Sequence, residues 1–232
     1  MLKKWDELPN FMRCEEVKLY YEVLSKKQLS LKLKRIFDVI FAGFILIILA
    51  IPMIIISIMI KIDSPGPVFY RQERITAYGK KFKIHKFRTM VNNADKIGTA
   101  VTIEGDSRIT AVGLKLRNLR IDEVPQLLDI LSGIMSFVGT RPEATKYVEK
   151  YTEEMRATLL LPAGITSEAS IRYKDEAKLL VETQNVDYIY INNILPEKMK
   201  YNLKSIREFS LIEEAKTMFR TVFAVLGKEY SE

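Results

Sequence analysis

Residues 39–60 read VIFAGFILIILAIPMIIISIMI, a run of 22 residues without a charged side chain. Asp38 is the only charge added when the run is extended back to Ile36. A straight α-helix of this length measures about 33 Å, which is close to the thickness of the hydrocarbon core of a bilayer. The run therefore predicts a helix that enters a membrane, and it decides how the rest of the chain is arranged.

Pro52 lies inside this run. Proline lacks a backbone N–H and its ring clashes with the preceding turn, so it is expected to break or kink the helix. Basic residues stand on both sides of the run: Lys32, Lys34 and Arg35 precede it, and Lys61, Arg71 and Arg74 follow it. The positive-inside rule places both flanks in the cytoplasm. We therefore expect a re-entrant, helix-break-helix segment over residues 32–62 with the membrane bend at Pro52, and a spanning helix is the alternative.

The composition restricts the chemistry that the 232 residues can perform. The length suits one domain with a sizeable core. The single cysteine, Cys14, excludes a disulfide within the chain, and the single histidine, His85, argues against a histidine-based triad or a structural zinc site. Residues 1–30 are polar and hold no apolar run, so no cleavable signal peptide is expected. Catalysis must then rest on Asp, Glu, Lys and Arg.

The net charge of +7 is concentrated in one part of the chain. Between residues 71 and 88, one acid stands among seven basic residues: Arg71, Arg74, Lys80, Lys81, Lys83, Lys86 and Arg88. Such a cluster attracts nucleic acid, anionic lipid or a phosphorylated substrate. Because no helix-turn-helix, RNA-binding or zinc-finger pattern accompanies it, we expect no nucleic acid partner and favour a lipid surface or a phosphate.

Two short strands are predicted after the apolar run. Residues 68–74 and 81–88 alternate between polar and apolar side chains and are joined across Tyr78 and Gly79. The alternation places Lys86 on the apolar face of the second strand. A lysine in this position indicates a function, or it reaches solvent from the end of the strand.

Helical patterns follow at residues 113–119 and 122–131, and Gly133 ends the second of them. The fold class is therefore α/β, helix-rich and small in sheet. An amphipathic helix is predicted near the C-terminus, where apolar residues recur at spacings of three and four: Leu203, Ile206, Phe209, Ile212, Ala215, Phe219, Val222 and Leu226. This helix lies in the membrane interface or packs on the core of the domain.

The adjacent acids Asp122 and Glu123 are the strongest candidates for catalysis. With Pro125 close behind, they also suit a helix start, where an acid caps free N–H groups. Three arginines flank the pair in the sequence: Arg117, Arg120 and Arg141. Arginine binds phosphate oxygens bidentately, and carboxylates with substrate phosphates suit Mg²⁺. Since adjacent residues on a helix point about 100° apart, the two acids are expected to have different roles.

Three blocks of sequence carry a resemblance to a known family: KFRTM at residues 86–90, DEVPQL at 122–127 and VGTRPE at 138–143. Together they resemble the small monotopic phosphoglycosyl transferases, also called bacterial sugar transferases or polyprenyl-phosphate sugar-phosphate transferases. The resemblance covers about residues 34–182. It implies transfer of a phosphosugar from a UDP-sugar to polyprenyl (undecaprenyl) phosphate, with release of UMP, as the first membrane step of surface glycan synthesis.

The resemblance also implies roles for individual residues. Asp122 corresponds to a nucleophile that forms a covalent aspartyl phosphosugar, and Glu123 corresponds to a ligand of Mg²⁺. The residues that it implies for binding substrate phosphate are Lys86, Arg88, Arg117 and Arg141. Ile51 replaces the serine that the family has before Pro52, so the spanning alternative stays open. Residues 162–166 read PAGIT, with an inserted alanine, and the following residues depart from the family, which leaves the sugar open.

The predicted organisation has four parts: an N-terminal extension (1–31), the membrane segment (32–62), a catalytic domain (63–182) and a C-terminal helical region (183–232). The resemblance places the protein in the cytoplasmic (inner) membrane of a bacterium, in contact with its lipid, with the catalytic domain on the cytoplasmic face. Self-association into a homo-oligomer stays open. Two other functions are also kept: a nucleotide-sugar hydrolase, and a non-catalytic membrane adaptor whose basic strands bind anionic lipid.

Overall fold

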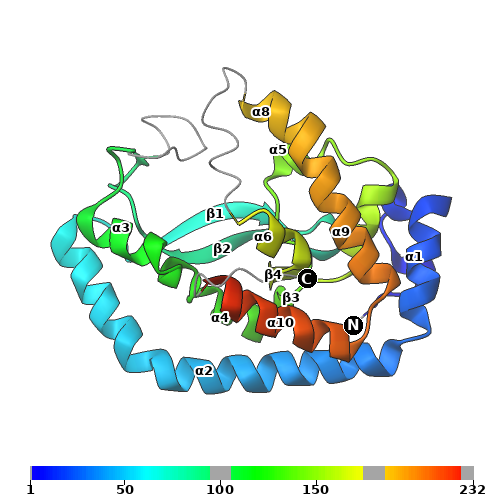
Figure 1. Cartoon of the computed structure of the whole chain (residues 1–232), viewed down its shortest axis with the longest axis horizontal. Helices are drawn as coiled ribbons and strands as arrows, with labels where there is room; N and C mark the ends of the chain where they lie inside the picture. Colours follow the sequence, from blue (N-terminus) through cyan, green and yellow to red (C-terminus); the bar gives the residue numbers. More distant parts are fainter. Residues whose placement is uncertain (1, 95–105, 175–185, 226–232) are drawn as a thin grey trace.

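The computed structural model describes residues 2–94, 106–174 and 186–225. The helices and strands in chain order are α1 (Glu15–Ser25), α2 (Gln28–Asp63), β1 (Phe69–Ile75), β2 (Lys81–Phe87), α3 (Ala111–Asn118), α4 (Gln126–Leu131), β3 (Met135–Val138), α5 (Thr145–Val148), β4 (Ala163–Thr166), α6 (Glu168–Arg172), α8 (Val186–Ile189), α9 (Leu195–Arg207) and α10 (Leu211–Val225). The helix-rich α/β class with a small sheet is thus confirmed (Figure 1).

The apolar run forms the long helix α2, which runs along the lower edge of the molecule and turns upward beside α3 (Figure 1). Pro52 lies inside α2, but the helix continues on both sides of it, so the segment is bent rather than interrupted. Among the described residues, α2 is the one helix long and apolar enough to cross a membrane, and 6% of its apolar window is buried. Its large apolar side chains therefore lie on the outside of the protein.

The first turns of α2 are fixed to the body by charged side chains. The buried carboxylate of Asp38 accepts a hydrogen bond of 2.8 Å from the hydroxyl of Ser136 in β3. Lys34 donates to the carbonyl of Val138 at 2.9 Å and pairs with Glu214 of α10. An aspartate inside an apolar helix is costly in lipid, so these bonds indicate that this end of α2 lies against protein.

The last turn of α2 is fixed to the same body. Arg88, just after β2, is 5% exposed and donates to the carbonyls of Ile60 and Ser64 at 3.3 and 2.6 Å, and to that of Pro65 at 3.0 Å. The carbonyl of Ile60 also accepts the backbone N–H of Ser64, and the carbonyls of Ser64 and Pro65 lie just beyond the end of the helix. The carboxylate of Asp63 accepts a 3.0 Å bond from the N–H of Val112 in α3. One body therefore holds both ends of α2.

The two strands β1 and β2 form an antiparallel hairpin, as the sequence predicts. The turn between them contains Tyr78 at φ 61° and Gly79 at φ 74°. Phe82 and Ile84 are buried, and Lys86 follows them on the same face, as expected from the alternation. This face packs on α4, so the strand carries Lys86 toward the acid pair.

The second sheet joins β3 and β4 in parallel and sets the position of the turn after β3. Gly139 donates to the carbonyl of Thr166 at 3.0 Å, and Gly164 donates to the carbonyl of Thr140 at 2.9 Å. A Cβ atom on Gly164 would lie 2.2 Å from the backbone nitrogen of Gly139, so the close approach requires glycine. Arg141 follows directly and is thereby aimed at the acid pair.

The apolar residues predicted to form one amphipathic helix from residue 203 to 226 are divided between α9 and α10, so the prediction of a single helix is wrong. The chain leaves the helix at Glu208 and starts α10 at Leu211. Phe209 is buried with the end of α9 in the main core, whereas Ile212 and Phe219 of α10 are exposed. The region thus combines a packed part and an exposed part. Leu226 and the predicted boundary at 182–183 lie outside the described residues.

The N-terminal extension supplies much of the same core. Leu8, Met12 and Val17 are buried there, together with Tyr20 and Leu24 of α1. They pack against α9 and the 3₁₀ segment Glu154–Leu160.

Candidate active site

The acid pair lies on a 3₁₀ turn, Ile121–Glu123, between α3 and α4. The predicted helix at 122–131 is therefore too long, since α4 begins at Gln126. Arg120, directly before the turn, has φ 54°, a left-handed conformation that costs an arginine about 1–2 kcal/mol. No side chain caps α4, so Asp122 does not serve as its cap. This excludes a hydrogen-bonded cap on α4 as the role of Asp122.

Glu123 is held by two cations from different parts of the chain. Its carboxylate lies 2.7 Å from the ammonium of Lys86 on β2 and accepts two bonds from the guanidinium of Arg141, one of them at 3.2 Å. Burial acts to raise the pKa of Glu123, but Arg141 and Lys86 outweigh it and hold the pKa well below its ordinary value. Glu123 is therefore held as a carboxylate at neutral pH.

Asp122 has a different environment from its neighbour. Within the part of the chain that the structure describes, its carboxylate makes no hydrogen bond to another side chain, and it is half-buried. Burial raises the pKa of Asp122 above its ordinary value, the charge of Glu123 adds to the rise, and the cations Lys86, Arg117 and Arg141 oppose it. A desolvated carboxylate without hydrogen-bond donors suits a nucleophile. The two acids therefore have different environments, and their chemical roles stay predictions.

The structure brings together Lys86, Arg141 and the acid pair, with Arg117 close enough to act on the charge of Asp122. Arg88 is not part of this group, because its guanidinium is occupied by the carbonyls at the end of α2. Its assignment to substrate phosphate has no support in the geometry. The basic cluster of residues 71–88 is therefore divided, with one member at the site and another in a structural role.

His85 and Asp129 support Lys86, and neither of them was assigned to the site from the sequence. The buried Asp129 of α4 accepts from the backbone N–H of His85 at 2.9 Å and lies 2.7 Å from its Nδ1. The pair fastens β2 to α4 one residue before Lys86. Asp129 could have been identified from the sequence as an acidic residue on the apolar face of the predicted helix at 122–131.

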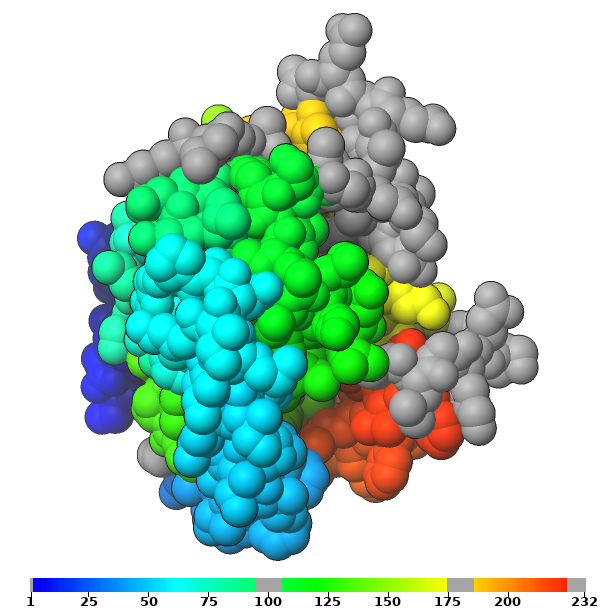
Figure 2. All heavy atoms as spheres, turned by 90° about the vertical axis from the view of Figure 1, so that its left-hand side faces the viewer, coloured from blue at the N-terminus to red at the C-terminus, as the bar shows by residue number. Residues whose placement is uncertain are grey.

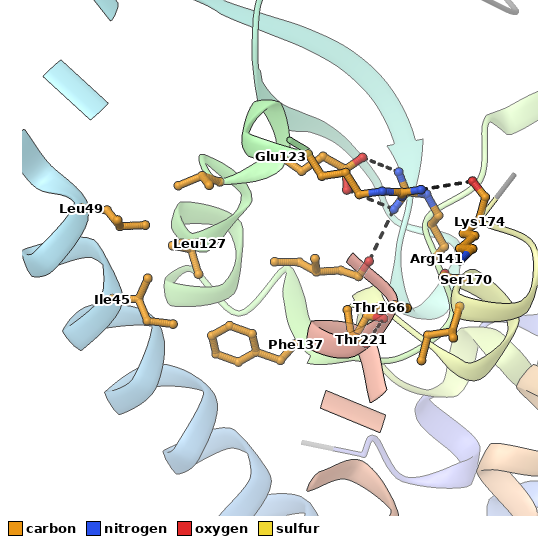
Figure 3. Close-up of a pocket in the computed structure, with 15 residues that line it drawn as sticks. Ile45, Leu49, Glu123, Leu127, Phe137, Arg141, Thr166, Ser170, Lys174 and Thr221 are labelled. Carbon is orange, nitrogen blue, oxygen red and sulfur yellow. Dashed lines mark hydrogen bonds and ion pairs between the residues drawn. The ribbon is translucent and has the colours of Figure 1, made fainter. Parts of the chain in front are cut away.

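A pocket of about 310 Å³ begins at Glu123 and Arg141 and extends to α2 and α10 (Figure 3). We call it the α2–α10 pocket. Its residues come from six elements and the turns beside them: Ile45, Leu49, Arg120, Glu123, Val124, Leu127, Phe137, Arg141, Ile165, Thr166, Ser170, Ile171, Lys174, Thr221 and Ala224. Figure 3 shows the apolar side chains of Ile45, Leu49 and Phe137 on one side, and Arg141 and Lys174 on the other. The pocket is thus apolar toward α2 and cationic toward the turn that follows β3.

Asp122 and Glu123 are the candidate ligands for a magnesium ion that binds together with substrate phosphates. Mg²⁺ uses one or two carboxylates plus phosphate oxygens and waters, rather than a cage of protein ligands. Asp122 and Glu123 supply two adjacent carboxylates, and among the described residues the one group of three candidate ligands, Cys14, Glu16 and Glu153, lies elsewhere in the chain. The donor types suit a metal that arrives with its substrate, and such an ion would replace Lys86 or Arg141 at an oxygen of Glu123, because both oxygens are bonded to these cations in the structure.

A family model described as bacterial sugar transferase matches residues 29–228, and the chain belongs to that family. The prediction of a phosphoglycosyl transferase is thereby confirmed, and the protein is an enzyme of this class. The matched part begins after α1, so most of the N-terminal extension lies outside it.

Three relatives illustrate the family. A putative undecaprenyl-phosphate N-acetylgalactosaminyl 1-phosphate transferase of Bacillus subtilis is 41% identical over 68% of this chain and 87% of its own length. A UDP-glucose:undecaprenyl-phosphate glucose-1-phosphate transferase of Escherichia coli is 35% identical over 82% of this chain. A UDP-N-acetylgalactosamine-undecaprenyl-phosphate N-acetylgalactosaminephosphotransferase of Aeromonas hydrophila is 30% identical over 84% of it. The match spans 39% and 44% of the length of the last two proteins.

Proposed function

We propose that the protein transfers a sugar 1-phosphate from a UDP-sugar to polyprenyl phosphate and releases UMP. One observation carries the proposal: a desolvated carboxylate, Asp122, lies among cations beside a pocket whose apolar wall is formed by the exposed helix α2. The names of the relatives support the same donor and acceptor classes. A site of this kind can receive a water-soluble phosphate and a lipid phosphate at one carboxylate.

The chemistry proceeds in two displacements at one phosphorus. A carboxylate oxygen of Asp122 attacks the phosphorus that bears the sugar, the bond from that phosphorus to the bridging oxygen breaks, and UMP leaves with the electron pair. An oxygen of the polyprenyl phosphate then attacks the same phosphorus. The bond to Asp122 breaks, the carboxylate returns, and the polyprenyl-diphosphate sugar is formed.

The other residues of the site position and neutralise the phosphates. Lys86 and Arg141 are held by Glu123, so they present a fixed positive charge beside Asp122. Arg117 adds a third cation. Glu123 would hold Mg²⁺ together with the substrate phosphates by exchanging Lys86 or Arg141 for the ion, which would neutralise the charge of the pyrophosphate.

For the membrane, we propose that α2 enters one leaflet of the bacterial inner membrane and returns, which leaves the catalytic body on the cytoplasmic face. The support is that one body holds Asp38 near the start of α2 and the carbonyl of Ser64 at its end, so the body lies on one side of the helix. The exposed apolar residues of α10, Ile212 and Phe219, extend the apolar surface. Figure 2 shows α2 and α10 in the same lower part of the molecule.

The test uses purified protein in detergent with Mg²⁺, undecaprenyl phosphate and a panel of UDP-sugars that includes UDP-glucose and UDP-N-acetylgalactosamine. We expect UMP release that depends on both lipid and Mg²⁺, and no turnover by Asp122→Asn. Full activity of that variant would exclude the aspartyl intermediate. Continuous release without lipid would indicate the hydrolase. Binding to anionic liposomes without turnover of any donor would favour the adaptor.

A further inference from the structure

The α2–α10 pocket contains two cations that the reaction described above does not use. Arg120 and Lys174 are exposed residues that line its polar end, and the guanidinium of Arg120 donates to the backbone carbonyl of Lys174 at 3.1 Å. Neither side chain forms an ion pair with a carboxylate in the parts of the chain that the structure describes. Both charges are thus available at the mouth of a pocket that is otherwise largely apolar.

The charges of the pocket match one phosphate. Its charged residues are Arg120, Arg141 and Lys174 against Glu123, and Arg141 is matched by Glu123. Arg120 and Lys174 therefore give the pocket a net charge of +2. A phosphate monoester carries about −1.5 to −2 at neutral pH, as phosphorylated side chains do. Arg120 also holds a left-handed backbone conformation directly before the acid pair, and such strain is common where a side chain must be aimed at a ligand.

The walls of the pocket match a long apolar chain rather than a nucleotide sugar. Ile45 and Leu49 come from the exposed helix α2, and Phe137 and Leu127 continue the apolar surface (Figure 3). Ala224 of α10 lines the pocket as well. A pocket of about 310 Å³ holds a phosphate and the first part of a long chain. The rest of that chain can leave between α2 and α10, whose outer faces are apolar.

We propose that this pocket is the binding site of the acceptor, a long-chain isoprenoid phosphate, and that Arg120 and Lys174 bind its phosphate. The inference rests on the proposed function. Glu123 lines the pocket and Asp122 does not. A phosphate bound in the pocket therefore lies beside Glu123, the residue that follows Asp122 in the sequence. The two steps of the reaction consequently use different cations: Lys86 and Arg117 act on the donor, and Arg120 and Lys174 act on the acceptor.

The test compares Arg120→Ala and Lys174→Ala with wild type and with Lys18→Ala, a matched loss of an exposed cation on α1. A charge-assisted hydrogen bond corresponds to roughly tenfold to hundredfold in affinity. We expect each pocket variant to raise the KM for polyprenyl phosphate by about tenfold or more, with a much smaller change in the KM for the UDP-sugar. Lys18→Ala should change neither. A rise in the donor KM alone, or no change in the acceptor KM, would overturn the assignment.

A binding measurement separates this inference from the function on which it rests. Farnesyl phosphate should bind wild type in detergent, Arg120→Ala should bind it at least tenfold more weakly, and Ala224→Trp should also weaken it by filling the apolar wall. Farnesol and inorganic phosphate, each lacking one half of the ligand, should bind more weakly than farnesyl phosphate. Equal binding of inorganic phosphate would overturn the lipid as occupant. Intact farnesyl phosphate binding in a protein that turns over no donor would refute only the proposed reaction.

Discussion

Replacement of Arg88 by methionine should destabilise the protein and leave donor binding unchanged. The guanidinium is 5% exposed and donates to three carbonyls at the end of α2, at 3.3, 2.6 and 3.0 Å. It also donates to the hydroxyl of Ser64 at 3.0 Å. Methionine keeps most of the apolar stem but provides no donor, so the carbonyls of Ser64 and Pro65 lose this partner, whereas that of Ile60 keeps the N–H of Ser64.

The magnitude follows from those contacts. Hydrogen bonds from a charged donor contribute about 1.5–3 kcal/mol each, but bonds from one guanidinium are not additive. Removing the donor leaves the carbonyls of Ser64 and Pro65 unsatisfied at about 1–3 kcal/mol each, and we take about 3–5 kcal/mol for Arg88→Met. A change of 1 kcal/mol shifts the melting temperature of a chain of this size by roughly 2–4 °C. The expected decrease is therefore about 6–20 °C.

The assay is thermal unfolding in detergent, followed by the fluorescence of the single tryptophan, Trp5, together with the KM for UDP-sugar below the transition. Lys86→Met is the matched control, because it removes a cation two residues earlier that pairs with Glu123. It should reduce turnover strongly and lower the melting temperature far less. An unchanged melting temperature for Arg88→Met, combined with a raised donor KM, would refute the structural role and restore the phosphate contact that the family resemblance implies.

Two further predictions concern the acid pair. Because Asp122 has a raised pKa and must be ionised to attack, kcat/KM should fall as the pH falls through that pKa. Lys86→Met removes a charge that lowers this pKa, so the acidic limb of the pH profile should move to higher pH. An unmoved acidic limb would exclude Asp122 as the titrating group. Glu123 has a depressed pKa, so its stabilisation is present above the unfolded pKa and is lost only as pH falls through the folded one. Glu123→Gln should therefore cost about 1–3 kcal/mol at neutral pH, which a lower melting temperature would show, and no shift would mean that Arg141 and Lys86 find other partners.

The sequence predicts the elements whose pattern is local. Alternation over residues 81–88 places Lys86 on the inner face of a strand, and that face carries it to Glu123. Gly133 ends α4 with φ 81°, as expected for a glycine after a helix. In both cases the decisive information, a period of two or a missing Cβ, is contained in a few neighbouring residues.

Features that depend on tertiary contacts are missed. Arg88 belongs to a basic cluster, and the composition of a cluster does not distinguish a buried arginine from one that faces a ligand. The break at residues 208–210 preserves the apolar spacing of three and four, so the periodicity continues through a gap between two helices. Asp129 is identified only when β2 is seen to pack on α4. Arg120 lines the pocket and has a left-handed backbone conformation. Sequence patterns predict that conformation for glycine or asparagine and not for arginine.

The position of α2 connects stability to the proposed acceptor site. The helix contributes Ile45 and Leu49 to the pocket, and it is fixed by Asp38 at one end and by Arg88 at the other. A loss of either attachment frees one end of a helix that forms the apolar wall, whereas Lys86 is attached independently through β2 and α4. On the proposed function, destabilisation at Arg88 should consequently affect the lipid acceptor before the UDP-sugar. The same reasoning explains why a membrane helix carries a buried aspartate: its carboxylate fixes the wall of the pocket relative to β3, and thus relative to the turn that holds Arg141.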